Sequence, residues 1–170
     1  MWSLLLAMTI GFGGIGPPLR LPPNGNPVSQ KNLRPQAVNC TLSALTMNFG
    51  TYAPLGADMT TPLEVAGSFK VSCGGGTGDY SVTANAGVNS AHATATCATA
   101  TCTRAMLTGT SYVSYDLYVD NGYTTVWNAT NAITGSTSSN VTIPVYGYIP
   151  AGIAETAGNY QDTVTVTVSF

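Results

Sequence analysis

The fold class follows from the stretch Asp162-Thr163-Val164-Thr165-Val166-Thr167-Val168-Ser169-Phe170, in which valines and a phenylalanine alternate with threonine and serine. Successive side chains of a β-strand point to opposite faces, so this alternation gives one apolar face and one polar face. We therefore predict a strand over residues 161–170 that lines a hydrophobic core with its apolar face.

The sequence before this stretch has a similar texture of short runs rich in Val, Thr, Tyr and Phe. These runs are separated by turn signals such as Gly74-Gly75-Gly76, Asn121-Gly122 and Ala157-Gly158-Asn159. Strands are predicted near residues 41–49, 63–73, 79–86, 104–108, 113–120, 124–128, 140–148 and 161–170. No segment of ten or more residues after Cys40 has a convincing helical period, so an all-β sandwich is predicted.

The composition limits the classes of partner. The 170 residues suit one domain, and the 44% share of hydrophobic residues argues against disorder. Charged residues make up only 7% of the chain, and its five Lys and Arg are too few and too scattered to neutralise a row of phosphates. We therefore expect no nucleic-acid partner, and a surface of Thr, Ser, Asn and Gly that suits a packed assembly.

Four cysteines, Cys40, Cys73, Cys97 and Cys102, form an even set without the Cys-x-x-Cys spacing of zinc and redox sites. Disulfides explain this set better, and they imply an oxidising compartment such as a periplasm or the cell exterior.

Residues 1–39 differ from the rest of the chain. Residues 14–39 are rich in Pro, Gly and Asn, with prolines at positions 17, 18, 22, 23, 27 and 35, and prolines remove backbone donors and favour extended conformations. We predict a linker over 14–39 and one folded domain over 40–170.

Four pieces of the sequence, in order, resemble the spore coat protein U domain family, which includes subunits of archaic (Csu-type) chaperone–usher pili. The pieces are Cys40-Thr41-Leu42-Ser43 with Phe49-Gly50-Thr51-Tyr52; Val71-Ser72-Cys73; Arg104-Ala105-Met106 with Tyr115-Asp116-Leu117-Tyr118; and Tyr146-Gly147-Tyr148-Ile149-Pro150-Ala151-Gly152 leading into Gly158-Asn159-Tyr160-Gln161-Asp162-Thr163-Val164. The resemblance covers residues 40–170. The chain departs from it just before Cys40, where the polar, proline-broken segment 28–35 stands in place of an alternating donor segment.

The resemblance implies an incomplete immunoglobulin-like β-sandwich that lacks its final strand and is completed by a donor strand. In such a family a periplasmic chaperone fills the groove first, and the amino-terminal strand of the next subunit replaces it in the fibre. The expected partners are identical or homologous subunits, the chaperone and an outer-membrane usher. The expected location is an extracellular, cell-surface pilus, reached through the periplasm.

A candidate donor strand lies upstream, in residues 1–13. Its alternate positions hold the large apolar residues Trp2, Leu4, Leu6, Met8, Ile10 and Phe12. The predicted wall of the acceptor groove consists of Val164, Val166, Val168 and Phe170. A signal peptide is the alternative for residues 1–13, although the first basic side chain is Arg20 and the apolar run meets Pro17-Pro18. An ordinary structural strand is a third possibility, and the long linker would also let the segment fold back into its own groove.

We further predict that Cys40–Cys73 is a buried bond tying the first strand to a later one, and that Cys97–Cys102 staples a local loop.

Two groups of residues raise the alternative of a metal site: His92 with Cys97 and Cys102, and Asp116 with Asp120 and Asn121. A disulfide explains the cysteines more simply, and Asp120-Asn121-Gly122 is typical of a hairpin turn between residues 115–119 and 124–127. We therefore expect no metal and no cofactor.

Catalysis has little chemistry to draw on, because the seven carboxylates are scattered and no nucleophile motif occurs. A secreted hydrolase would require several of Asp79, Asp116, Asp120 and Asp162 to converge in one cleft. We predict a structural pilus subunit, not an enzyme, that polymerises by donor-strand exchange and serves adhesion or biofilm formation. The alternative is a tip adhesin or a self-contained secreted spore-coat-type protein.

Overall fold

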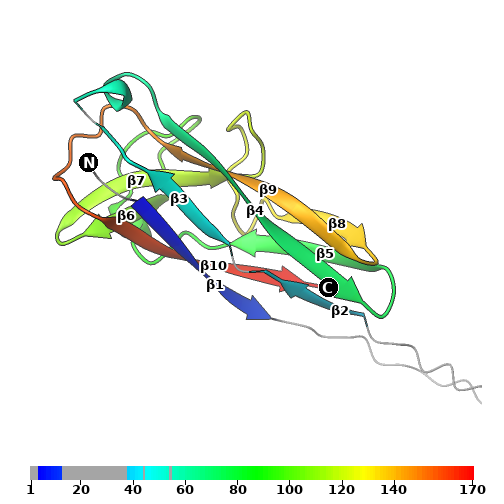
Figure 1. Ribbon diagram of the computed structural model, residues 1–170. Coiled ribbons are helices and arrows are strands. Elements are labelled where there is room, and N and C mark those ends of the chain that lie inside the picture. Colours follow the sequence, from blue (N-terminus) through cyan, green and yellow to red (C-terminus); the bar gives the residue numbers. More distant parts are fainter. Residues whose placement is uncertain (1–3, 13–37, 44, 54) are drawn as a thin grey trace, which may run out of the picture.

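Strands make up almost all of the regular structure in the part of the chain that the computed structural model describes, which is the backbone of residues 4–12 and the whole of residues 38–43, 45–53 and 55–170 (Figure 1). The strands are β1 (Leu4–Phe12), β2 (Asn39–Leu42), β3 (Thr46–Gly50), β4 (Leu63–Gly74), β5 (Gly78–Ala84), β6 (Arg104–Thr108), β7 (Ser111–Tyr118), β8 (Ile133–Thr137), β9 (Asn140–Ile149) and β10 (Tyr160–Ser169). Two three-residue 3-10 turns, Ala57–Met59 and Ser90–His92, are the only helical elements among these residues, and neither is long enough to cross a membrane.

The strands form two layers. One layer has the order β2-β4-β9-β7, and the other contains β8, β5, β10, β1 and β3. Strand β6 pairs with both β7 and β10 and so joins the layers along one side. Apart from β1, which runs parallel to β10, all neighbouring strands are antiparallel. The predicted all-β sandwich is confirmed.

The predicted strand over residues 41–49 is two strands in different layers. Strand β2 pairs with β4, whereas β3 pairs with β1. The chain changes layer after Ser43, whose backbone N–H donates to the Lys70 carbonyl and whose Oγ accepts from the Lys70 N–H. The sequence contains the signal for this break. The apolar residues Cys40 and Leu42 stand at even positions, whereas Leu45, Met47 and Phe49 stand at odd positions, so one continuous strand could not place all of them on the same face.

The predicted strand over residues 124–128 is wrong, and the strand Ile133–Thr137 was not predicted. Residues 119–132 form a loop with one isolated bridge, Tyr118 to Val126. Trp127 lies in this loop and is fully buried. Its burial comes from a loop that folds over the core and not from a strand.

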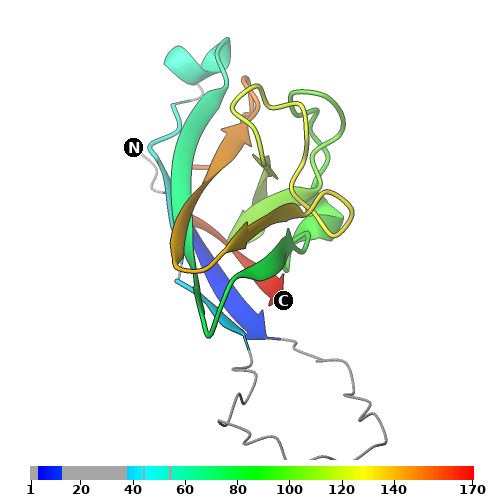
Figure 2. The ribbon, with the colours of Figure 1, turned by 90° about the vertical axis from the view of Figure 1, so that its right-hand side faces the viewer.

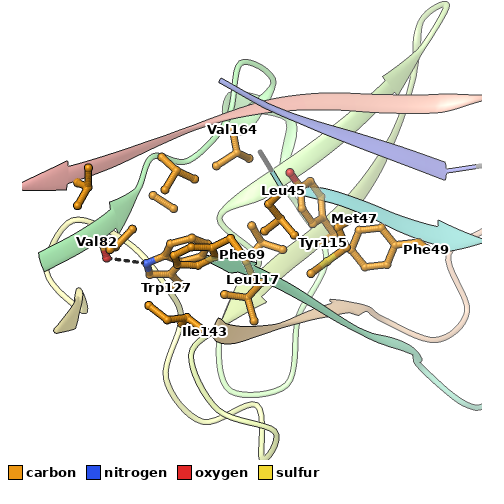
Figure 3. Close-up of a cluster of buried hydrophobic side chains, with 14 of the residues drawn as sticks. Leu45, Met47, Phe49, Phe69, Val82, Tyr115, Leu117, Trp127, Ile143 and Val164 are labelled. Atoms are coloured by element: carbon orange, nitrogen blue, oxygen red, sulfur yellow. Dashed lines mark hydrogen bonds between the residues drawn. The ribbon is translucent and has the colours of Figure 1, made fainter. Parts of the chain in front are cut away.

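The core lies between the layers (Figure 3). The Trp127 ring stacks on Phe69 at 5.5 Å between centroids, and its Nε1–H donates to the Val82 carbonyl at 3.0 Å. At the other end of the cluster, Phe49 meets the ring of Tyr115 edge-on at 5.7 Å. These contacts join strands of both layers through one continuous apolar cluster.

Candidate strand-acceptor site

Strand β10 presents its apolar face to the core. Val164, Val166 and Val168 are almost fully buried, while the threonines between them are half-buried. Phe170 differs from the three valines, because it follows the end of β10 and its side chain is 39% exposed.

One edge of β10 is satisfied by three successive partners. Gln161 pairs with β6, residues 163 and 165 bond to the loop after β5, and the end of the strand pairs with β5. In that loop the Val88 N–H donates to the Thr163 carbonyl, and Asn85 exchanges hydrogen bonds with Thr165. Among the described residues, the other edge of β10 pairs with β1 alone.

Strand β1 fills the space between β10 and β3 (Figures 1 and 2). It runs parallel to β10 over its whole length, and its first four residues pair antiparallel with β3. The register sets Leu4, Leu6, Met8, Ile10 and Phe12 opposite Tyr160, Asp162, Val164, Val166 and Val168. Each of these five positions of β10 carries a buried side chain. Trp2 and residues 13–37 lie outside the described residues.

Strand β3 forms the opposite wall of this site. Its Met47 and Phe49 side chains are buried and reach across the core to Gly147 of β9. A Cβ at position 147 would lie 2.6 Å from both the Met47 sulfur and the Phe49 ring, so only glycine leaves room for them. Gly147 therefore allows β3 to pack closely on the other layer while its outer edge pairs with β1.

A buried carboxyl group lies beside this site. Asp162 of β10 accepts hydrogen bonds from the Tyr115 hydroxyl at 2.8 Å and from the Val88 N–H and Asn89 Nδ2 at 3.1 Å each. Burial raises the pKa of Asp162, and the hydrogen bond from Tyr115 is the largest of the effects that lower it. Burial, together with the negative charge of Asp162, raises the pKa of Tyr115 well above its ordinary value.

Sequence reasoning did not single out this role of Asp162. Asp162 is two residues before Val164, so the alternation of the strand places its side chain on the apolar face of β10. A carboxylate on an apolar face was the signal in the sequence that buried hydrogen-bond donors would surround it. Gly87, with φ of 79°, closes the loop over it, and a Cβ there would clash with the Asp162 carboxylate.

Comparison with known proteins identifies the family and the fold. The family model described as the Spore Coat Protein U domain matches residues 31–167. The chain belongs to the Spore Coat Protein U domain family. A curated relative, Protein U of Myxococcus xanthus, is 31% identical to this Spore Coat Protein U domain over 131 residues, which are 74% of this chain and 72% of that protein.

A solved structure shares the fold. It is a chaperone–tip adhesion subunit pre-assembly complex from the archaic chaperone–usher Csu pili of Acinetobacter baumannii, with a TM-score of 0.54 and 24% identity. The match covers 78% of this Spore Coat Protein U domain chain but only 40% of that chain. This likeness shows the fold, an immunoglobulin-like sandwich.

The two predicted disulfides are present in this Spore Coat Protein U domain. Cys40–Cys73 joins β2 to β4 at a register pair whose Cα atoms are 4.1 Å apart. Cys97–Cys102 closes a small loop in which the backbone N–H of each cysteine also donates to a loop carbonyl. The first bond links distant parts of the chain, whereas the second is local.

A buried ion pair fixes β6 against β7. Arg104 is fully buried, and its Nη1 lies 2.8 Å from Oδ1 of Asp116. The guanidinium also donates to the carbonyls of Asn85 and Trp127, and Thr103 donates to Asp116 through its N–H and its hydroxyl. The pair is therefore hydrogen-bonded on both sides and holds the loops after β5 and β7 in place.

The remaining candidate residues have separate surroundings. His92 stacks on Tyr112 at 3.8 Å, and its neighbouring cysteines are bonded to each other. The Asp120 carboxylate accepts hydrogen bonds from the backbone of Gly122, Thr124 and Thr125, but the predicted hairpin is absent because no strand follows at 124–127. Asp79 is exposed on β5. Within the described residues no three His, Cys, Asp or Glu side chains gather into a cluster that would hold a metal ion.

Proposed function

We propose that this Spore Coat Protein U domain chain is a structural subunit of an extracellular bacterial pilus, polymerised by donor-strand exchange, and that the pilus serves adhesion or biofilm formation. The subunit passes through the periplasm, where its disulfides form, and it is not an enzyme.

The observation that carries the proposal is the position of β1. One edge of β10 and the facing edge of β3 are joined, among the described residues, only by this strand. It is separated from β2 by the 26 residues of positions 13–38. A strand that completes a sheet and is joined to the domain by so long a connection can be replaced by the same strand of another copy, without altering the rest of the domain.

The proposed donor residues are Trp2, Leu4, Leu6, Met8, Ile10 and Phe12, and the proposed acceptor residues include Val164, Val166 and Val168. Six large apolar side chains would contribute on the order of 9–18 kcal/mol on full burial, before the ordering of strand and linker is subtracted. Dissociation of a neighbouring subunit would therefore be slow.

The proposed partners follow from the open edge. Before assembly, an unfilled groove would expose strand edges that pair with any extended chain, so a chaperone must cover it. The similar structure from Acinetobacter baumannii is itself a complex of a chaperone with a pilus subunit, which supports a periplasmic chaperone and, in the same pathway, an outer-membrane usher.

Donor substitutions at alternating positions test the proposal. The triple variant Leu6→Asp, Met8→Asp and Ile10→Asp changes positions that pair with buried residues of β10, whereas Leu5→Asp, Ala7→Asp and Thr9→Asp change the intervening ones. Electron microscopy and pelleting should show fibres for the second variant and none for the first. Equal fibre formation by both variants, or by a chain lacking residues 1–13, would refute strand donation.

A second candidate is a self-contained secreted coat protein, and the pairing of β1 with β10 of the same chain favours it. Thr9 and Thr165 are register partners, so the double variant Thr9→Cys with Thr165→Cys would form a disulfide wherever this pairing exists. In assemblies grown from isotopically light and heavy chains of this variant, mass spectrometry should find light–heavy peptides joined between positions 9 and 165 if the strand is donated with the direction and register that it has here. Bonds within single chains alone would support the coat protein.

A further inference from the structure

Tyrosines from three separate segments meet on the outer face of the β4-β9-β7 layer. Tyr118 of β7 is buried, and its ring centroid lies 5.5 Å from that of Tyr123 and 6.2 Å from that of Tyr148. The half-buried Tyr123 ring also lies 6.4 Å from Tyr146 and 5.3 Å from Tyr148, which are both half-buried. The exposed Glu64 of β4 is the register partner of Tyr148. We call these five residues the tyrosine face.

The loop before β8 is built to place one of these rings. Tyr123 has φ of 53°, the only positive φ at a non-glycine residue among the described residues. The Asp120 carboxylate holds this conformation by accepting hydrogen bonds from the backbone of Gly122, Thr124 and Thr125. A non-glycine residue keeps this conformation only where its surroundings enforce it, and such positions cluster at functional sites.

Charge is divided unevenly along the chain. All seven Asp and Glu lie after residue 39, and the only Lys or Arg residues in that part of the sequence are Lys70 and the buried Arg104. The other three cations, Arg20, Lys31 and Arg34, lie in residues 13–37, which contain no acidic residue. The linker is therefore basic, and the domain that carries the tyrosine face is acidic.

We propose that the tyrosine face is the docking site for the basic, proline-rich segment Pro17-Pro18-Leu19-Arg20-Leu21-Pro22-Pro23 of a neighbouring copy of this chain. Proline-rich segments favour the extended polyproline II helix and bind surfaces lined by aromatic rings. The prolines stack on the tyrosine rings, and the Arg20 guanidinium meets Glu64 and the ring faces. The contact is a second link between copies, independent of strand donation.

The geometry selects a neighbour over the same chain. Arg20 follows Phe12 by eight residues and so extends at most about 26 Å from the end of β1. The tyrosine face lies on the outside of the opposite layer. Its Glu64 is ten residues along β4 from Gly74, about 33 Å from the end at which the linker enters β2.

Peptide binding tests the docking. The receptor is the full chain with Arg20→Glu, Pro22→Gly and Pro23→Gly, so that its own segment does not compete, and the probe is a fluorescent peptide of residues 14–27. Anisotropy should show saturable binding. Affinity should fall about tenfold or more when the receptor also carries Tyr146→Ser and Tyr148→Ser, and Glu64→Gln should weaken binding and flatten its salt dependence.

Tyr112→Ser is the matched receptor control, because Tyr112 is half-buried and stacks on His92 away from the tyrosine face. It should leave binding unchanged, and thermal melts should show that every receptor is folded. Absence of binding, equal binding of a scrambled peptide, or equal binding to the double-serine receptor would overturn the proposal.

A photo-cross-linking residue at position 21 of the full chain identifies the copy that supplies the segment. Mixed light and heavy chains should give cross-links between chains at residues 118–123 or 146–148. Cross-links within single chains would overturn the assignment to a neighbour. Because the peptide assay does not involve β1, failure of strand donation and failure of this docking are separable.

Discussion

The Tyr115 hydroxyl donates a 2.8 Å hydrogen bond to the buried carboxylate of Asp162, which belongs to β10, the strand that pairs with β1. The pair joins β7 to β10, and protonation of Asp162 therefore affects the link between these two strands. The consequence can be measured.

Burial raises the folded-state pKa of Asp162 above 3.8, so the folded chain binds more protons than the unfolded chain between pH 3.8 and the raised pKa. The stabilisation from this group is present below pH 3.8 and is lost as pH rises through the folded pKa. Asp162→Asn removes this pH dependence. In urea unfolding, the free energy of unfolding of the variant should therefore rise relative to that of the wild type as pH increases from 3.8. A constant difference between the two proteins across this range would contradict the assignment.

Removing Arg104 should strongly destabilise the domain. Arg104→Met leaves the buried Asp116 without its counter-charge, and breaking a buried pair in this way costs about 3–5 kcal/mol. The double variant Arg104→Met with Asp116→Asn should recover part of the loss, because no unpaired charge remains. Urea denaturation of the three proteins measures both effects, and a loss below about 1 kcal/mol in the single variant would argue against the buried pair.

Gly147→Ala should destabilise the wall formed by β3. The added Cβ would lie 2.6 Å from Met47 and Phe49, and overpacking of this kind costs about 1–3 kcal/mol. Gly74→Ala is the control, because a Cβ there meets nothing within 4 Å. Thermal unfolding of the two variants should differ clearly, and equal melting temperatures would contradict the close packing at Gly147.

The two disulfides should differ in their contribution to stability. In the loop-entropy model, closing 33 residues disfavours the unfolded chain by about 3.7 kcal/mol and closing five residues by about 2 kcal/mol. Replacing Cys40 and Cys73 by Ser should therefore lower the free energy of unfolding more than replacing Cys97 and Cys102. Peptide mapping without reduction should recover both linkages, and a Cys40–Cys97 product would contradict them.

Val166→Asp should prevent the pairing of β1 with β10, and it should also prevent assembly into fibres. The side chain is 4% exposed, so an unpaired charge there would cost several kcal/mol. Gln161→Asp on the exposed face of β10 is the control and should assemble normally. Secretion assays and electron microscopy of both variants decide the matter, and normal fibres from Val166→Asp would exclude this strand as the acceptor.

The sequence allowed prediction of those features that rest on local periodicity. The alternation in residues 161–170 predicted β10, and the cysteines predicted both disulfides. The strand Ile133–Thr137 was not predicted, because Ile133 is its only large apolar residue and the strand is fixed by its pairing with β5. The predicted strand over residues 124–128 was wrong, because a loop can bury a large ring such as that of Trp127 when the ring N–H donates to a distant carbonyl.

The candidate site depends even more on long-range geometry. Alternation alone marked the valines of β10, but it could not show that the loop holding Val88 satisfies one edge of that strand and leaves the other to β1. The Asp162 hydrogen bonds likewise join residues more than forty positions apart in the sequence.

The pairing of β1 also bears on the direction of any strand that enters this site. Because β1 is parallel to β10 and antiparallel to β3, the two walls run in opposite directions. A strand inserted the other way round would again have one parallel and one antiparallel neighbour, so the backbone ladders scarcely distinguish the two senses. The fit of alternate side chains must therefore choose the polarity. That choice decides from which end of the sandwich the connecting chain emerges and, in a fibre formed by the proposed strand donation, how successive copies are oriented.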